Sequence, residues 1–119
     1  MAGVPRLDLV HKAIGAGSLG QIQWKDSALR RLRDDEEMVS FTASGIRSEL
    51  RAFVLQGNSL TVRNETRAEW LEDYPDDPHW YRAILPVAEF PKGLFVEVKL
   101  VDDADDDPWV EIVSVHRQL

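Results

Sequence analysis

The last predicted strand of this chain ends in side chains that could carry out acid–base chemistry. Residues 109–116 are rich in β-branched and aromatic side chains and are predicted to form a strand, and Arg117 follows His116. A histidine changes its charge near neutral pH, so His116 could act as a general acid or base. Strand alternation predicts that His116 shares a face with Ser114 and Ile112. A solvent-exposed histidine without a catalytic role is the alternative.

Arginines elsewhere in the chain could contribute to a site with such a histidine. Arg82 alternates with large apolar residues in the segment 80–87, so we expect it on a partly buried sheet face. A carboxylate partner would instead make Arg82 structural. Arg47 and Arg51 lie four residues apart on a predicted helix and project from the same helix face, which makes them candidates for substrate binding. Pairing with neighbouring acidic side chains is the alternative for these two arginines.

Several motifs are similar to ligand sites but lack a required part. Residues 15–20 match G-x-G-x-x-G, yet a dinucleotide fingerprint needs a strand before it and a helix after it, and here the predicted order is reversed. The aspartates of residues 102–107 have the spacing of a calcium loop without its glycine and final glutamate. His11, His79 and His116 are far apart, and the chain has no cysteine. We therefore predict no metal and no cofactor, and a solvated loop at 102–107.

Helices precede most of the strands in the predicted order. Apolar side chains at helical spacing predict helices at residues 5–14 and 28–37, and from a Ser44 cap to a stop at Gly57. Asp26 or Ser27 is the candidate cap of the second helix. Alternation predicts strands at residues 21–24, 60–64, 80–87, 94–101 and 109–116. The acidic residues 65–78 contain two prolines and are predicted to form a loop with at most one helical turn.

This order of elements predicts the fold class. Short connections between successive strands favour an antiparallel meander. We therefore predict an α+β domain, with a curved, mainly antiparallel sheet of four to five strands and two to three helices packed on one face. The length of 119 residues suits one domain, so we expect residues 1–119 to form a single unit, in which residues 1–19 are an N-terminal helix and turn.

The net charge of −7 is concentrated in the second half of the chain. Residues 1–60 carry 8 Lys/Arg and 7 Asp/Glu, whereas residues 61–119 carry 6 and 14, so the halves carry +1 and −8. This acidity opposes non-specific binding of nucleic acid, which depends on neutralising phosphates. No apolar run is long enough to span a membrane, and the N-terminus lacks the pattern of a signal peptide, so we expect a cytoplasmic protein with no membrane partner.

A family resemblance rests on the order of the elements and on a few residues in each. The segment QIQWKDSALRRLRDDEE (residues 21–37) resembles the opening strand and helix of RelE/ParE-superfamily toxins. The segments GNSLTV, HWYRAILPV, GLFVEVKLV and WVEIVSVHRQ are similar to the successive sheet strands of that fold. The resemblance covers residues 20–118 and is strongest to the uncharacterised small-domain branch of the superfamily. It implies a compact RelE-like sheet with two helices packed against it.

The activity that this resemblance implies is metal-independent endoribonuclease cleavage of RNA by a toxin, which an antitoxin-like protein neutralises. In such enzymes the 2′-hydroxyl attacks the adjacent phosphate, basic side chains stabilise the charge, and a His, Tyr or carboxylate moves protons. His116 and Arg117 match the polar end of the family's last strand, and Arg82 matches a strand position facing the concave surface. The chain departs from the family in its acidity and in lacking the lysine-rich helical face of ribosome-dependent members.

A non-enzymatic interaction module is the alternative function. The acidic segments 72–77 and 102–107 would then bind a basic protein partner, and the terminal strand would be only structural. Such a complex would weaken at high salt, because salt screens attraction between exposed charges.

Overall fold

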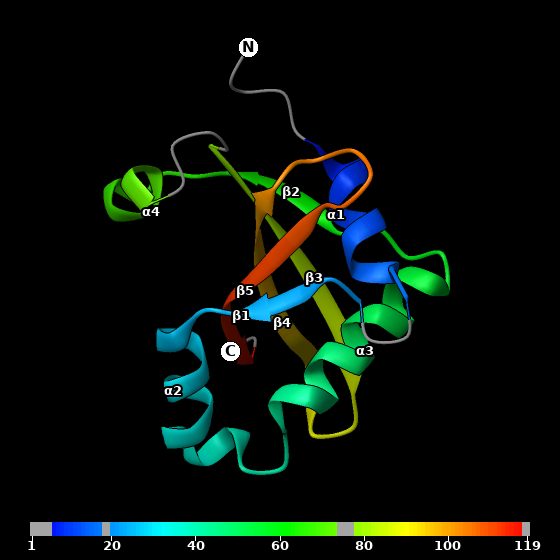
Figure 1. The fold of residues 1–119 in the computed structure, drawn as a ribbon. Helices are drawn as coiled ribbons and strands as arrows, with labels where there is room; N and C mark the ends of the chain where they lie inside the picture. Colours follow the sequence, from blue (N-terminus) through cyan, green and yellow to red (C-terminus); the bar gives the residue numbers. More distant parts are fainter. Residues whose placement is uncertain (1–5, 18–19, 74–77, 118–119) are drawn as a thin grey trace.

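The computed structural model describes residues 6–17, 20–73 and 78–117, which form a sheet with helices beside it (Figure 1). The helices are α1 (Leu7–Gly15), α2 (Asp26–Asp34), the 3₁₀ helix η1 (Glu36–Met38), α3 (Ala43–Leu55) and α4 (Ala68–Asp73). The strands are β1 (Ile22–Trp24), β2 (Thr61–Asn64), β3 (His79–Val87), β4 (Phe90–Asp102) and β5 (Trp109–Arg117). Within these described residues, no helix is both long and apolar enough to cross a membrane.

The strands form one five-stranded sheet in the order β1-β5-β4-β3-β2. Successive strands from β2 to β5 pair antiparallel, as predicted for a meander. β1 instead pairs parallel with β5, with Ile22 opposite Val110. A parallel pair needs a long connection, and here the whole remainder of the fold provides it. The predicted α+β class with a mainly antiparallel sheet is confirmed.

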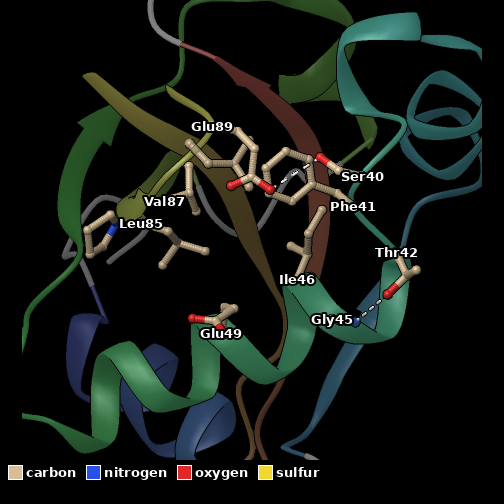
Figure 2. A pocket seen from close by; sticks show the side chains of 11 residues that line it. Ser40, Phe41, Thr42, Gly45, Ile46, Glu49, Leu85, Val87 and Glu89 are labelled. Carbon is tan, nitrogen blue, oxygen red and sulfur yellow. Dashed lines mark hydrogen bonds between the residues drawn. The ribbon is translucent and has the colours of Figure 1, made fainter. Parts of the chain in front are cut away.

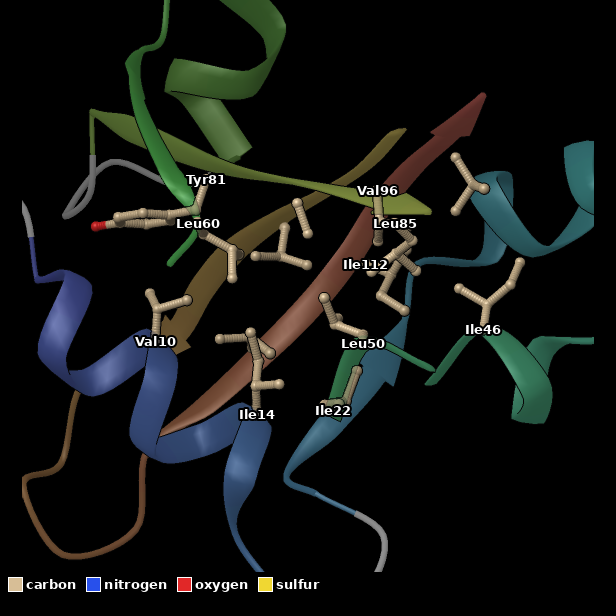
Figure 3. Close-up of a cluster of buried hydrophobic side chains, with 14 of the residues drawn as sticks. Val10, Ile14, Ile22, Ile46, Leu50, Leu60, Tyr81, Leu85, Val96 and Ile112 are labelled. Atoms are coloured by element: carbon tan, nitrogen blue, oxygen red, sulfur yellow. The ribbon is translucent and has the colours of Figure 1, made fainter. Parts of the chain in front are cut away.

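The hydrophobic core lies between one face of the sheet and the helices α1 and α3 (Figure 3). Val10 and Ile14 of α1 are fully buried, as their helical spacing predicts, and Ile46 and Leu50 of α3 pack into the same core. Alternate residues of β4 complete it, namely Leu94, Val96, Val98 and Leu100. Burying a side chain of this size contributes about 1.5–3 kcal/mol, so this layer sets the position of the sheet.

The opposite face of the sheet is also covered along its central strand. On β4, Phe95, Glu97 and Lys99 alternate with the core residues, and all three are buried. The segment that follows β2 lies against this face, because Glu65 approaches Lys99 and Arg67 approaches Glu97. Figure 1 shows α4, which continues this segment, standing apart from the layer of α1 and α3. This second face therefore combines burial with charge.

Some helix ends differ from the predicted ones. α2 begins at Asp26 and has Lys25 as its N-cap, so no side chain caps it. Thr42, not Ser44, caps α3, and its hydroxyl accepts a hydrogen bond from the Gly45 N–H at 3.0 Å. α4 has 6 residues, which is longer than the single turn predicted for the segment 65–78. Both prolines of that segment come after Asp73 in the sequence, so neither lies within α4.

Candidate functional site

A β-bulge in β5 determines which side chains of the last strand reach the second face of the sheet. Glu97 of β4 lies opposite Ser114, but the next residue of β4 lies opposite Ile112, so Val113 is an extra residue. Ile112 therefore points into the core, whereas Ser114 and His116 lie on the opposite face. The prediction that Ile112, Ser114 and His116 share a face is wrong, because the bulge reverses the alternation.

The bulge brings His116 into a cluster of charged side chains on the second face. We call this cluster the sheet-face network, and its members are Glu65, Arg67, Arg82, Glu97, Lys99 and His116. Its cations outnumber its carboxylates, although the whole chain carries a net charge of −7. The network is therefore a place where an anion could bind to an otherwise acidic protein.

The deepest part of the network is an ion pair between Lys99 and Glu65. The Lys99 Nζ lies 3.6 Å from Glu65 Oε1, and neither side chain has any exposed surface. Lys99 also donates a hydrogen bond of 2.7 Å to the carbonyl oxygen of His79. A buried ammonium is tolerated only when it is paired and hydrogen-bonded in this way. This ion pair fastens the segment after β2 to the sheet.

Arg67 links this buried pair to the rest of the network. Its Nε donates to Glu65 Oε2 at 2.8 Å, and its Nη2 lies 3.8 Å from Glu97 Oε2. Burial acts to raise the pKa of the Glu65 carboxyl, but the hydrogen bonds from Arg67 and the charges of Arg67 and Lys99 outweigh it, and the pKa is lowered. The hydrogen bond to Glu65 raises the pKa of Arg67. Glu65 therefore remains ionised in its buried position.

His116 is the exposed acid–base group of the network. Its Nε2 lies 2.9 Å from Glu97 Oε1, and its Nδ1 lies 3.3 Å from the carbonyl oxygen of Arg117. Two acceptors around the ring favour the imidazolium, which can donate from both nitrogens. The hydrogen bond to Glu97 raises the pKa of His116, and partial burial and the charge of Arg82 oppose this without cancelling it. His116 is thus suited to donate a proton near neutral pH.

Arg82 is a cation that forms no ion pair within the described part of the chain. Glu97 is its cross-strand neighbour, but that carboxylate contacts His116 instead. The guanidinium carbon lies 4.7 Å from the centre of the Phe95 ring and 6.0 Å from that of Trp80. Aromatic faces attract a cation without neutralising it, so Arg82 can still bind an anion. The carboxylate partner that would have made Arg82 structural is not found among these residues.

The structure does not bring the other predicted site residues to this network. Arg117 lies on the core side of the sheet, because consecutive residues of a strand point to opposite faces. Its Nε lies 2.7 Å from Glu37 Oε2. Arg47 and Arg51 belong to α3 in the helix layer, and Arg51 donates a hydrogen bond to the carbonyl oxygen of Gly17. Of the predicted residues, only His116 and Arg82 therefore lie together on the second face.

The other two histidines have structural roles. The Leu60 N–H donates to His11 Nε2 at 3.1 Å, so this nitrogen is unprotonated. Burial lowers the pKa of His11, which is consistent with a neutral ring. His79 is buried at the start of β3, where its carbonyl oxygen accepts the hydrogen bond from Lys99. In the part of the chain that the structure describes, no group of side chains could hold a metal ion.

The acidic loop 102–107 lies at the far end of β4 and β5 and is folded against α1. Its aspartates are exposed, as predicted for a solvated loop. Arg6 Nη2 lies 3.3 Å from Asp105 Oδ1, Lys12 donates to the Asp105 carbonyl oxygen, and Gln21 donates to Asp107. Exposed contacts of this kind contribute little to stability, because water and salt screen the charges. Residues 74–77 of the second acidic segment and 18–19 of the glycine motif lie outside the described residues.

Sequence reasoning missed the other four members of the network. Glu65, Arg67, Glu97 and Lys99 were not predicted as site residues. A signal was present in the alternating strand 94–101, where a glutamate and a lysine replace apolar residues on one face. A charge next to so many apolar residues requires a partner from elsewhere in the fold.

Comparisons with family models, with curated proteins and with solved structures find no match to this chain. The function is therefore argued from the geometry of the sheet-face network.

Proposed function

We propose that this protein is a toxin-type domain with metal-independent endoribonuclease activity, which acts in the cytoplasm and is neutralised by an antitoxin-like partner. The main support is that His116 and Arg82 lie on one face of the sheet, with Phe95 of the strand between them. The His116 ring lies 5.6 Å from the Phe95 ring, and the Arg82 guanidinium lies 4.7 Å from it. A proton donor and a cation at this spacing could contact the same phosphodiester.

In the proposed reaction, the 2′-hydroxyl oxygen attacks the adjacent phosphorus and the bond to the 5′-oxygen breaks. The 2′-hydroxyl proton passes to water, and the His116 imidazolium donates a proton to the leaving 5′-oxygen. Nε2 of His116 is hydrogen-bonded to Glu97. Nδ1 is therefore the nitrogen available to the substrate, because the contact between Nδ1 and the Arg117 carbonyl oxygen is long, at 3.3 Å. Arg82 stabilises the negative charge that develops on the phosphate oxygens. The products are a 2′,3′-cyclic phosphate and a 5′-hydroxyl.

RNA recognition by an acidic protein requires local contacts. The net charge of −7 weakens any non-specific attraction to phosphates. The affinity would therefore come from Arg82 and His116 and from Trp80, a half-buried aromatic residue on the same face. Stacking of a base on an aromatic ring is worth about 1–3 kcal/mol and tolerates different sequences. We therefore expect single-stranded RNA to be the preferred substrate.

The test is cleavage of a single-stranded oligoribonucleotide in the presence of EDTA, with identification of the product ends. We expect 2′,3′-cyclic phosphate and 5′-hydroxyl ends, and no cleavage of the same oligonucleotide made with 2′-deoxyribose. His116→Ala should lower the rate by about 10²-fold or more, because the proton donor is lost. Arg82→Gln should lower it by about 10²–10³-fold, because charge stabilisation is lost.

Arg33→Gln is the matched control for Arg82→Gln, because Arg33 is an exposed arginine of α2. Its rate should equal that of the wild type, and circular dichroism should show that all variants are folded. Cleavage that persists in both site variants, or that also occurs in DNA, would show that another group or a contaminant is responsible. Absence of cleavage by the wild type would leave the interaction module as the better explanation of the chain.

A further inference from the structure

A pocket of about 330 Å³ lies between the beginning of α3 and the end of β3, and it shares no residue with the sheet-face network (Figure 2). Its floor is apolar and includes Phe41, Ile46, Leu85 and Val87. Phe41 is held in place by the neighbouring ring of Phe90, whose centre is 5.6 Å away. The pocket can therefore accept an apolar chain without rearranging the core.

The rim of this pocket is acidic on two sides. Glu49 extends from α3 and Glu89 from the turn between β3 and β4, and Figure 2 shows them on opposite sides of the apolar floor. The hydroxyl of Ser40 lies 3.2 Å from Glu89 Oε2 and orients that carboxylate. Glu49 forms no hydrogen bond or ion pair with any described residue. Two carboxylates above an apolar floor provide a complementary environment for a cation with an apolar stem.

The pocket continues as a groove along α3. A smaller hollow of about 60 Å³ shares Glu49, Leu85 and Pro86 with it and reaches Asn58. β2 pairs only with residues His79 to Arg82 of β3, so in the described sheet the remainder of β3 has no strand on this side. Pro86 has no N–H to offer to an added strand. Binding in this groove would therefore depend on side chains more than on backbone pairing.

We infer that this pocket binds an arginine side chain that a partner protein presents. The methylene groups of the arginine would lie on the apolar floor, with the guanidinium between Glu49 and Glu89 and close to the Phe41 ring. Val39, next to Ser40 at the rim, is 86% exposed and offers an apolar contact for the residues that flank the arginine. The pocket lies apart from the sheet-face network, so this inference does not depend on the proposed ribonuclease activity.

The probe for this inference is the capped tripeptide acetyl-Leu-Arg-Leu-amide, titrated into the whole protein labelled with ¹⁵N. We expect it to shift the backbone amide signals of Ile46, Glu49, Val87 and Glu89 with a dissociation constant of about 1 mM. The same peptide with citrulline is the neutral control, because citrulline has nearly the shape of arginine without its charge. It should bind at least about tenfold more weakly.

The double variant Glu49→Gln and Glu89→Gln should reduce binding of the arginine peptide to the level of the citrulline peptide. Glu72→Gln on α4 is the matched control and should leave binding unchanged, since Glu72 is an exposed carboxylate outside the pocket. Thermal unfolding would establish that each variant is folded. Equal binding of the two peptides, undiminished binding to the double variant, or no shift at about 10 mM peptide would each overturn the inference.

Discussion

The exposed imidazole of His116 contacts the buried carboxylate of Glu97. The two side chains meet through Nε2 and Oε1 at 2.9 Å, and their exposed fractions are 46% and 10%. A buried carboxylate attracts the charged form of its partner, which raises the pKa of that partner. The protonation of His116 is therefore controlled by a residue that the substrate need not touch, and this relationship can be tested by substitution.

Replacing Glu97 should change the pH dependence of RNA cleavage. If His116 is the proton donor, activity falls as the pH rises through its raised pKa. Glu97→Gln removes the main cause of the raised pKa, so this loss of activity should move to lower pH. Glu111→Gln is the control, because Glu111 lies on β5 and its contact is with Gln23. An unchanged pH–rate profile in Glu97→Gln would show that Glu97 does not control the pKa of the proton donor.

The same pair should make part of the stability depend on pH. The folded-state pKa of His116 is raised above the ordinary value of 6.5, so its contribution is fully present below that pH and is lost as the pH rises through the raised pKa. The difference in free energy of unfolding between the wild type and His116→Gln should therefore be larger near pH ~6 than near pH ~9. Urea unfolding at both values measures it. A constant difference would mean that the pair does not couple to folding.

Substitutions at Lys99 and Glu65 should have non-additive effects on stability, because the two side chains form a buried ion pair. Glu65→Gln removes the buried carboxylate that lies 3.6 Å from the ammonium of Lys99, and Lys99→Met removes the cation of the same pair. We expect Glu65→Gln to lower the free energy of unfolding by about 3 kcal/mol. The double variant should lose less than the sum of the two single losses, since no unpaired buried charge remains. Chemical denaturation of the four proteins measures this, and strictly additive losses would contradict the pairing.

Gly93 should tolerate substitution less well than Gly57, although both have a positive φ. The two values are 90° and 91°, so an added Cβ costs about 1–2 kcal/mol at either position. At Gly57 the new Cβ would meet open space, whereas at Gly93 it would lie 2.7 Å from Ile84 Cγ2 and 3.1 Å from the Leu85 carbonyl oxygen. Gly93→Ala should therefore lower the melting temperature clearly more than Gly57→Ala. Equal changes would mean that the part of β3 beside Gly93 can relax.

The sheet and its helices were largely predictable because their signals are local. The alternation of residues 94–101 and the helical spacing of Val10 and Ile14 place apolar side chains on one face, whatever the rest of the fold. The parallel position of β1 was not predictable in this way. Its pairing of Ile22 with Val110 joins residues from opposite ends of the chain, and no local pattern specifies such a neighbour.

The candidate site also combines features that local patterns predict with features that only long-range contacts determine. Residue types alone identified His116 and Arg82 as candidates, because imidazole and guanidinium groups have the required chemistry wherever they lie. The extra residue Val113 in β5 then turns His116 toward Arg82, and a strand without it would have placed His116 on the core side. The sequence thus determined the groups available for chemistry and the elements that carry them. Only the tertiary structure determined which groups meet, because a bulge and a buried ion pair depend on strands that are distant in the chain.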